Sequence, residues 1–233
     1  MPSKIIYKEE IVRDIATAWQ CSDEADLRYM AENMSVRRFK KNELIYREGK
    51  KPNRLLYLVR GKVKIVKECS VGRTQIVRAV REQHFIGCRA FFAHENYTTS
   101  AMAFEDSMIA IFPIEVLERM MAKNTGVLKY FLYELAVIVG NSDDHIVSYT
   151  QKHIRGRLAD AILGLKNKYG VESDGATLSI TMSRDDIASM SNMSTSNAIR
   201  TLSAFVQEKV VTIERKKIKI LDEEGLKKIS QMG

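Results

Sequence analysis

Residues 181–202, TMSRDDIASMSNMSTSNAIRTL, are dense in small hydroxyl side chains: five of the 22 residues are serine and three are threonine. Serine competes with the backbone for hydrogen bonds and is a mediocre residue inside a helix. The segment is therefore either a disordered, low-complexity patch or two short capped helices whose exposed hydroxyls face a polar partner. With Asn197 and Arg200, these hydroxyls are suited to bind phosphate oxygens and base edges of DNA.

The spacing of the polar residues favours two helices. Ser183 is followed three residues later by Asp186, which is the pattern of a capping box, and predicts a helix to about Met190. Asn192 stands where the chain must turn sharply, and asparagine tolerates the left-handed conformation. Ser194 then caps a second helix. The apolar face is expected to comprise Ile187, Met190, Met193, Ala198, Ile199, Leu202 and Phe205.

The segment VVTIERKKIKILD (210–222) predicts two strands about a tight basic turn. A strand pair after two short helices is the arrangement of a winged helix-turn-helix, whose second helix enters the major groove. Two surface helices of an ordinary helical domain are the alternative. The residues expected to contact DNA are Ser183, Ser194, Thr195, Ser196, Asn197, Arg200, Lys216 and Lys217.

The first half of the chain has the pattern of a β-rich domain. Residues 22–34 predict a short helix with Ser22 as its N-cap. Short β-like runs follow at intervals of roughly ten residues, which indicates a sandwich or a roll. The runs lie at 55–68, with a turn at Arg60-Gly61, and at 74–80, 84–87, 97–104 and 107–113.

A long helix is expected to start near Asn124, after a short one at 114–122. Its seam residues are spaced alternately by four and three, which is a heptad pattern and favours a parallel homodimer axis. A helix packed on its own domain is the alternative. The seam comprises Leu128, Leu132, Leu135, Val139, Ser142, Ile146, Tyr149 and His153, of which Leu128, Leu132, Leu135, Val139, Ile146 and Tyr149 form the expected interface. A helix at 153–170 follows, then a loop leading into a short strand (171–182).

The composition is that of a globular protein, and the net charge of +8 over 233 residues suits a polyanionic partner. The three cysteines, Cys21, Cys69 and Cys88, are far apart and form no CxxC pair, which argues against disulfides, zinc and a four-cysteine cluster. We expect a cytoplasmic protein without a signal peptide or a membrane span. No enzyme is expected, because no nucleophile–base set or phosphate-binding glycine loop is found.

The order of these segments resembles the cyclic-AMP receptor protein/Fnr (Crp/Fnr) family of bacterial transcription regulators. The resemblance spans about residues 22–222 and rests on LLYLVRGKVKIVK, HFIGCRAFFAHENYTTSA, IRGRLADAIL and SRDDIASMSNMSTSNAIRTLSAFVQEKVV. It implies an α+β chain with a β-roll sensor domain and N-terminal helices (1–123), a dimerisation helix (124–153) and a winged helix-turn-helix (154–233).

The resemblance also implies a function. It indicates a homodimeric, sequence-specific regulator that binds promoter DNA and contacts RNA polymerase. The rival is a cyclic-nucleotide-binding module that acts through a protein partner. In the family's recognition helix an Arg-Glu pair precedes an arginine by about one turn; here Thr195 and Ser196 replace the pair, and Arg200 is retained.

The resemblance argues against cyclic AMP as the effector. Cyclic-nucleotide-binding members carry a Gly-Glu pair and, about ten residues later, an Arg-Ser pair that holds the phosphate. Residues 87–101, called the cassette below, keep Gly87 and Ser100 but have Cys88 for the glutamate and Thr99 for the arginine. The expected effector pocket comprises Gly87, Cys88, Arg89, Thr99, Ser100 and Ser142. Arg89 either points to solvent, which is the favoured interpretation, or replaces the missing arginine as the cation.

Other effectors stay open. A haem could use as axial ligand one of four histidines or the Cys88 thiolate, and Cys88 could act as a redox group. The histidines are His84, His94, His145 and His153. An Fnr-type iron–sulfur cluster is not expected, because its clustered N-terminal cysteines are absent. The sequence is also compatible with no effector at all.

Overall fold

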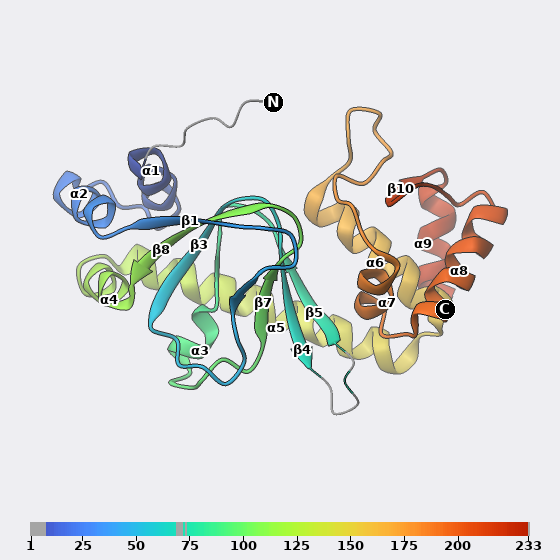
Figure 1. Cartoon of the computed structure of the whole chain (residues 1–233), viewed down its shortest axis with the longest axis horizontal. Coiled ribbons are helices and arrows are strands. Elements are labelled where there is room, and N and C mark those ends of the chain that lie inside the picture. Colours follow the sequence, from blue (N-terminus) through green and yellow to red (C-terminus); the bar gives the residue numbers. More distant parts are fainter. Residues whose placement is uncertain (1–7, 69–71, 73, 233) are drawn as a thin grey trace. The chain divides into compact units, whose positions relative to one another are not determined.

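The computed structural model describes residues 8–68, 72 and 74–232, which form two compact units (Figure 1). Within the described residues, one unit comprises 8–68 and 77–139, and the other comprises 72, 74–76 and 140–232. The division falls inside the long helix, between residues 139 and 140, so the three-part division at 123 and 153 stays a prediction. Cys69 lies outside the described residues.

The first unit is a roll of two four-stranded antiparallel sheets with helices at one end (Figure 1). The sheet orders are β1-β8-β3-β6 and β2-β7-β4-β5. The strands are β1 (Ser35–Phe39), β2 (Leu44–Tyr46), β3 (Arg54–Arg60), β4 (Val63–Glu68), β5 (Thr74–Val80, whose first three residues are grouped with the second unit), β6 (His84–Ile86), β7 (Ser100–Ala103) and β8 (Ser107–Pro113). The helices are α1 (Lys8–Trp19), α2 (Glu24–Glu32), α3 (Cys88–Phe92) and α4 (Ile114–Lys123).

Two apolar clusters hold this unit together. One fills the roll between the sheets and includes Phe39, Leu58 and Ile65. The other joins the helices to the outer face of the first sheet, and its centre is Trp19, which is fully buried and stacks on Phe85 with ring centroids 5.4 Å apart. Burial of such large aromatic side chains dominates core energetics, so these contacts fix the N-terminal helices on the roll.

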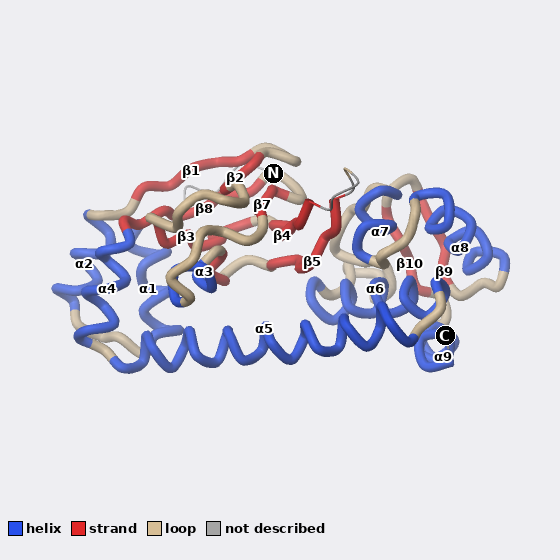
Figure 2. The backbone as a smooth tube through the Cα atoms, turned by 90° about the horizontal axis from the view of Figure 1, so that it is seen from below, coloured by secondary structure: helices blue, strands red, loops and turns tan. Residues whose placement is uncertain are grey.

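The long helix is α5 (Thr125–Gln151), and Figure 2 shows it as one continuous helix. The second unit then contains α6 (Ile154–Tyr169), α7 (Arg184–Met190), α8 (Thr195–Gln207), α9 (Glu223–Met232) and the hairpin of β9 (Val211–Glu214) and β10 (Lys217–Ile220). In the described ranges no helix, α5 included, has both the length and the apolar character that crossing a membrane requires.

The fold class and the order of elements are as predicted, with corrections at three places. The N-cap of α2 is Asp23 and not Ser22, because the Asp23 carboxylate accepts a hydrogen bond from the backbone N–H of Ala25 at 2.8 Å. Within 171–182 the described backbone forms only isolated bridges, Val171 with Leu178 and Thr177 with Lys219, in place of the expected strand. The sequence pattern does not delimit α1, β1, β2 and α3, which the structure adds.

The cap of α7 gives a test of this architecture. Replacing Ser183 with alanine removes both hydrogen bonds that its hydroxyl makes with Asp186, and an N-cap of this kind stabilises a helix by about 1 kcal/mol. Hydrogen exchange of the α7 amides, measured by mass spectrometry on the full chain, should become about five-fold faster. Ser196→Ala is the matched control because Ser196 is exposed and caps nothing. Equal exchange in both variants would show that the capping box does not hold α7.

Candidate nucleic-acid interface and sensor site

The two serine-rich helices have the caps that the sequence predicts. The Ser183 hydroxyl accepts from the Asp186 backbone N–H at 3.0 Å, and the Ser183 backbone N–H donates to the Asp186 carboxylate at 3.3 Å, which completes a capping box. Asn192 makes the turn with φ of 49°. Ser194 caps α8 by accepting from the backbone N–H of Asn197 at 3.3 Å. The serines thus begin two defined helices and do not form a low-complexity patch.

The two helices are also tied to each other. Thr195, the first residue of α8, donates its hydroxyl proton to the Asp185 carboxylate of α7 at 2.7 Å. A further serine of α7, Ser189, accepts from the backbone N–H of Ile76 at 2.7 Å and donates to the Thr74 carbonyl at 2.6 Å. Thr74, Ile76 and Ser189 all belong to the second unit. Of the predicted DNA contacts, Ser183, Ser194 and Thr195 therefore have structural partners.

The face of α8 that points outward is polar apart from two residues, Ile199 and Val206. Ala198, Leu202 and Phe205 are at most 1% exposed and fix the helix on its unit. Ser196 and Arg200 are exposed, and neither side chain makes a hydrogen bond or an ion pair with another described residue. Ile199, expected in the apolar face, is instead 46% exposed, while Thr201 takes a buried position. Met190 and Met193 are only partly buried.

The wing presents its charge at the hairpin turn. Arg215 has a positive φ of 58°, and it and Lys216 are exposed between β9 and β10. Lys217 differs from Lys216 because its ammonium pairs with the Glu172 carboxylate at 2.6 Å. The sequence analysis named Lys216 and Lys217 but not Arg215, although the run ERKK contains all three. The exposed basic group of this wing is therefore Arg215 and Lys216.

One side of α5 exposes the apolar seam that the heptad pattern predicts. The exposed fraction is 46% for Leu128, 70% for Leu132, 61% for Val139 and 61% for Ile146, whereas Leu135 is half-buried. Tyr149 differs from these residues, because it is half-buried and its hydroxyl donates to the Met190 carbonyl at 2.9 Å. Tyr149 thus has a role inside its own unit. An apolar stripe of this length on a helix is a surface that needs a partner.

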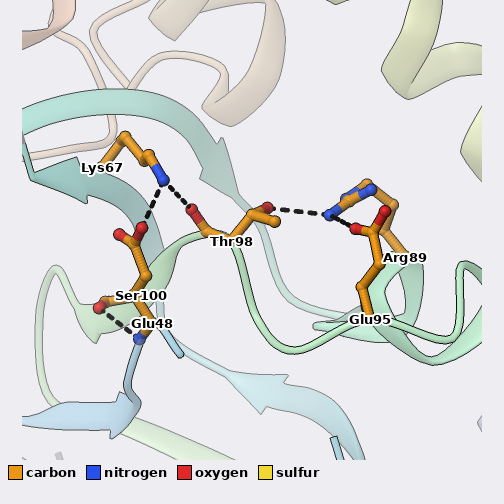
Figure 3. A network of polar contacts seen from close by, with 6 residues as sticks. All are labelled: Glu48, Lys67, Arg89, Glu95, Thr98 and Ser100. Carbon is orange, nitrogen blue, oxygen red and sulfur yellow. Dashed lines mark hydrogen bonds and ion pairs between the residues drawn. The ribbon is translucent and has the colours of Figure 1, made fainter. Parts of the chain in front are cut away.

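The cassette residues are occupied with one another (Figure 3). The Arg89 guanidinium, considered as an alternative cation for the pocket, donates to the Glu95 carboxylate at 3.0 Å and to the Thr98 hydroxyl at 2.9 Å. The Ser100 hydroxyl is buried and accepts from the Glu48 backbone N–H at 2.9 Å. Ser142, the remaining residue of the expected pocket, belongs to the second unit, and its place beside the cassette stays a prediction.

The Lys67 ammonium completes this network. It donates to the Glu48 carboxylate and, at 2.7 Å, to the Thr98 carbonyl. Each cation drawn in Figure 3 thus already has a carboxylate partner, and the exposed pairs are worth little in stability. A phosphate bound to the cassette would have to break such a pair.

Two stacked tyrosines close the roll over Gly87. The rings of Tyr46 and Tyr97 lie with centroids 4.0 Å apart, and a Cβ added at Gly87 would meet Tyr97 Cε1 at 2.9 Å and Tyr46 Cε1 at 3.3 Å. Thr99 is the hydrogen-bond partner of the Tyr46 hydroxyl. Cys88 and Thr99 stand at the positions expected for the glutamate and the arginine, so neither charged group is present there.

One guanidinium of the roll has a buried nitrogen without a hydrogen-bond partner among the described residues. Arg78 stands on β5 between Ile76 and Val80, both buried, so strand alternation directs it to the inner face. Its Nε is buried and makes no hydrogen bond with any described residue. Burial raises the pKa of Tyr46 and, to about 11, of Cys88, and the charge of Arg78 opposes both shifts. The sequence analysis missed Arg78, although an arginine in a strand of otherwise alternating pattern is the signal.

The Cys88 environment disfavours thiolate chemistry. Burial raises the pKa of the Cys88 thiol to about 11, so the group is protonated at neutral pH, whereas thiolate is the form that binds metals and reacts. The described residues contain no group of three or more His, Cys, Asp or Glu that could hold a metal. The four histidines are also divided between the units, His84 and His94 in the first and His145 and His153 in the second.

Comparison with known proteins matches both units to families. Residues 36–124 match the model of a cyclic nucleotide-binding domain, and residues 156–229 match a Crp-like helix-turn-helix domain. A global nitrogen regulator of a Nostoc species is 24% identical over 188 residues, which is 79% of this chain and 84% of that protein. A CRP-like cAMP-activated global transcriptional regulator of Mycobacterium tuberculosis is 23% identical, over 81% of this chain and 84% of that protein.

Solved structures share the fold. FixK2 from Bradyrhizobium japonicum superposes with a TM-score of 0.76 at 20% identity, over 84% of this chain and 96% of that one. The c-di-GMP responsive regulator CLP of Xanthomonas campestris gives 0.74 at 16% identity, over 85% and 99%. With the two family matches in this order along the sequence, the chain belongs to the Crp/Fnr family of DNA-binding transcription regulators.

Proposed function

We propose that this regulator binds near-palindromic promoter sites as a homodimer, with α8 in the major groove and the wing on the phosphate backbone. The observation that carries the proposal is the outward face of α8, where the unpartnered Arg200 stands beside exposed Ser196 at the capped end of the helix. A recognition helix contacts base edges with its N-terminal residues, and an arginine can bind guanine with two hydrogen bonds.

The exposed seam of α5 supports the dimer. Residues spaced by four and three on a 27-residue helix form a stripe that a second copy of the same helix can cover in parallel. A two-fold axis presents two copies of α8 to major grooves one helical turn apart, roughly 34 Å, which matches a palindromic site. The proposal also includes contact with RNA polymerase and a cytoplasmic location. It includes no enzymatic activity.

The sensor roll is proposed to respond to something other than cyclic AMP. Arg89 of the cassette and Lys67 of β4 have carboxylate partners, the tyrosine pair covers Gly87, and Thr99 cannot replace a guanidinium. The same departures argue against the rival function, a cyclic-nucleotide-binding module that acts through a protein partner.

The dimer proposal is tested by a double substitution. Val139→Asp with Ile146→Asp places four carboxylates per dimer in the seam, and burial of unpaired charge is costly, so the chain should sediment as a monomer. Val147→Asp is the matched control: Val147 is 56% exposed on the same helix but stands outside the seam, and this variant should stay dimeric. Loss of the dimer in the control, or its persistence in the double variant, would place the interface on another face.

The effector proposal predicts that cyclic AMP binds no more tightly than millimolar. A buried phosphate without a charge-assisted guanidinium partner loses most of its binding energy. Titration calorimetry of the full chain measures the affinity directly, with Arg78→Gln as the comparison. Micromolar binding of cyclic AMP to the unmodified protein would contradict the proposal. If that binding were lost in Arg78→Gln, Arg78 would be the guanidinium that meets the phosphate.

The DNA contact predicts different effects for the helix and the wing. Arg200→Ala should weaken binding to a selected site by about 5- to 150-fold (about 1–3 kcal/mol) and leave binding to random duplex nearly unchanged, because it removes a base contact. Lys216→Ala should weaken both duplexes alike and reduce the salt slope by about one unit. Lys217→Ala should do less, because Lys217 is paired with Glu172.

A salt-titrated binding assay on the two duplexes separates these outcomes. If Arg200→Ala weakens both duplexes equally, Arg200 contacts only the phosphate backbone, and the assignment of the base contact is wrong.

A further inference from the structure

An apolar side chain stands in the middle of the polar outer face of α8. Ile199 is 46% exposed, whereas its neighbour Ala198 is fully buried. Ser196 lies three residues before it and Ser203 four residues after it, which are the positions next to it on a helix surface. A single exposed isoleucine is ordinary on a protein surface. Its position between the groups proposed to meet DNA is what makes Ile199 informative.

One of the polar neighbours of Ile199 is already engaged within the helix. Ser203 donates its hydroxyl proton to the Ile199 carbonyl at 3.0 Å, so that proton is used inside the helix. Isoleucine in a helix keeps one dominant χ1 rotamer, so its methyl groups are presented in a nearly fixed direction. Ile199 therefore presents methyl groups in a fixed direction to whatever molecule α8 binds.

The major groove has one matching apolar group. Each base edge there presents hydrogen-bond donors and acceptors, and thymine adds its C5 methyl group. Isoleucine opposed to any other base edge covers polar atoms without giving them a hydrogen bond, which is unfavourable. Contact between Ile199 and a thymine methyl instead buries apolar surface on both sides.

We propose that Ile199 is a specificity-determining residue that contacts the C5 methyl of a thymine in each half-site, on a base pair next to the one that Arg200 contacts. The inference rests on the proposed function, because it requires α8 to lie in the major groove. It adds a methyl-dependent preference that neither Arg200 nor the serines can supply.

The test removes the methyl group alone. A half-site selected by the unmodified protein from random duplexes is resynthesised with each thymine in turn replaced by deoxyuridine, and affinity is measured for the unmodified chain and for Ile199→Ala. At one thymine per half-site, deoxyuridine should weaken the unmodified protein about four-fold, the loss expected for one buried methyl group. Ile199→Ala should weaken binding to the thymine duplex and show no further loss with deoxyuridine.

Two variants serve as controls. Val206 is 39% exposed and seven residues further along α8, on the same face but about 10 Å from Ile199, so Val206→Ala should keep the full thymine preference. Ile199→Val retains a β-branched side chain and should keep part of the thymine preference. Circular dichroism confirms that each variant is folded.

The outcomes are distinct. If no thymine loses affinity on conversion to deoxyuridine, or if the loss is the same in Ile199→Ala, the assignment of Ile199 is wrong. If Arg200→Ala still loses specific binding in that case, the proposed function stands without it. Equal binding of the selected site and random duplex by the unmodified protein would instead overturn the proposed function itself.

Discussion

The burial of one stripe of α8 determines what this protein can present to DNA. Ala198, Leu202 and Phe205 are packed against the rest of their unit, and together they fix the rotation of the helix about its axis. A helix turns by about 100° per residue, so a fixed stripe leaves no freedom for the others. Ser196, Ile199 and Arg200 must then point outward. The N-cap that Ser194 forms and the hydrogen bond from Thr195 to Asp185 fix where α8 begins.

The polar groups of the roll, unlike those on the outward face of α8, are directed to one another. Ser100, Glu48 and Lys67 form a chain of hydrogen bonds, and Arg89 is held by Glu95. A satisfied network of this kind gains nothing from an added anion unless a partner is displaced. Arg78 is different, since its buried Nε has no partner in the described part of the chain and leaving such a donor unpaired is costly. An effector that meets the roll from inside would find its charge partner on β5 and not on the cassette.

Much of the fold could be predicted from the sequence because its signals are local. The capping box of Ser183 and Asp186, the strand patterns and the heptad spacing of α5 each depend on residues close together along the chain. The outward position of Ile199 could not be predicted from hydrophobicity, which assigns isoleucine to the core. Helical spacing from Ala198 points to position 201, and there the chain buries Thr201. The pairing of Lys217 with Glu172, 45 residues away, depends on tertiary structure and leaves no local signal.

The short side chains at the start of α8 are related to the contact proposed for the exposed Ile199, because both require the helix to approach the bases closely. The family pattern has a long arginine and a glutamate where this chain has Thr195 and Ser196, and Thr195 is held by Asp185. Long side chains contact base edges while the helix stays some distance from them, whereas serine requires a close approach of the backbone. A close approach brings the next turn of the helix to the bases as well. At that distance an isoleucine can contact a methyl group, and Arg200 can form two hydrogen bonds without extending fully. If α8 lies in the major groove as proposed, specificity in this regulator is distributed over one polar and one apolar contact on consecutive residues.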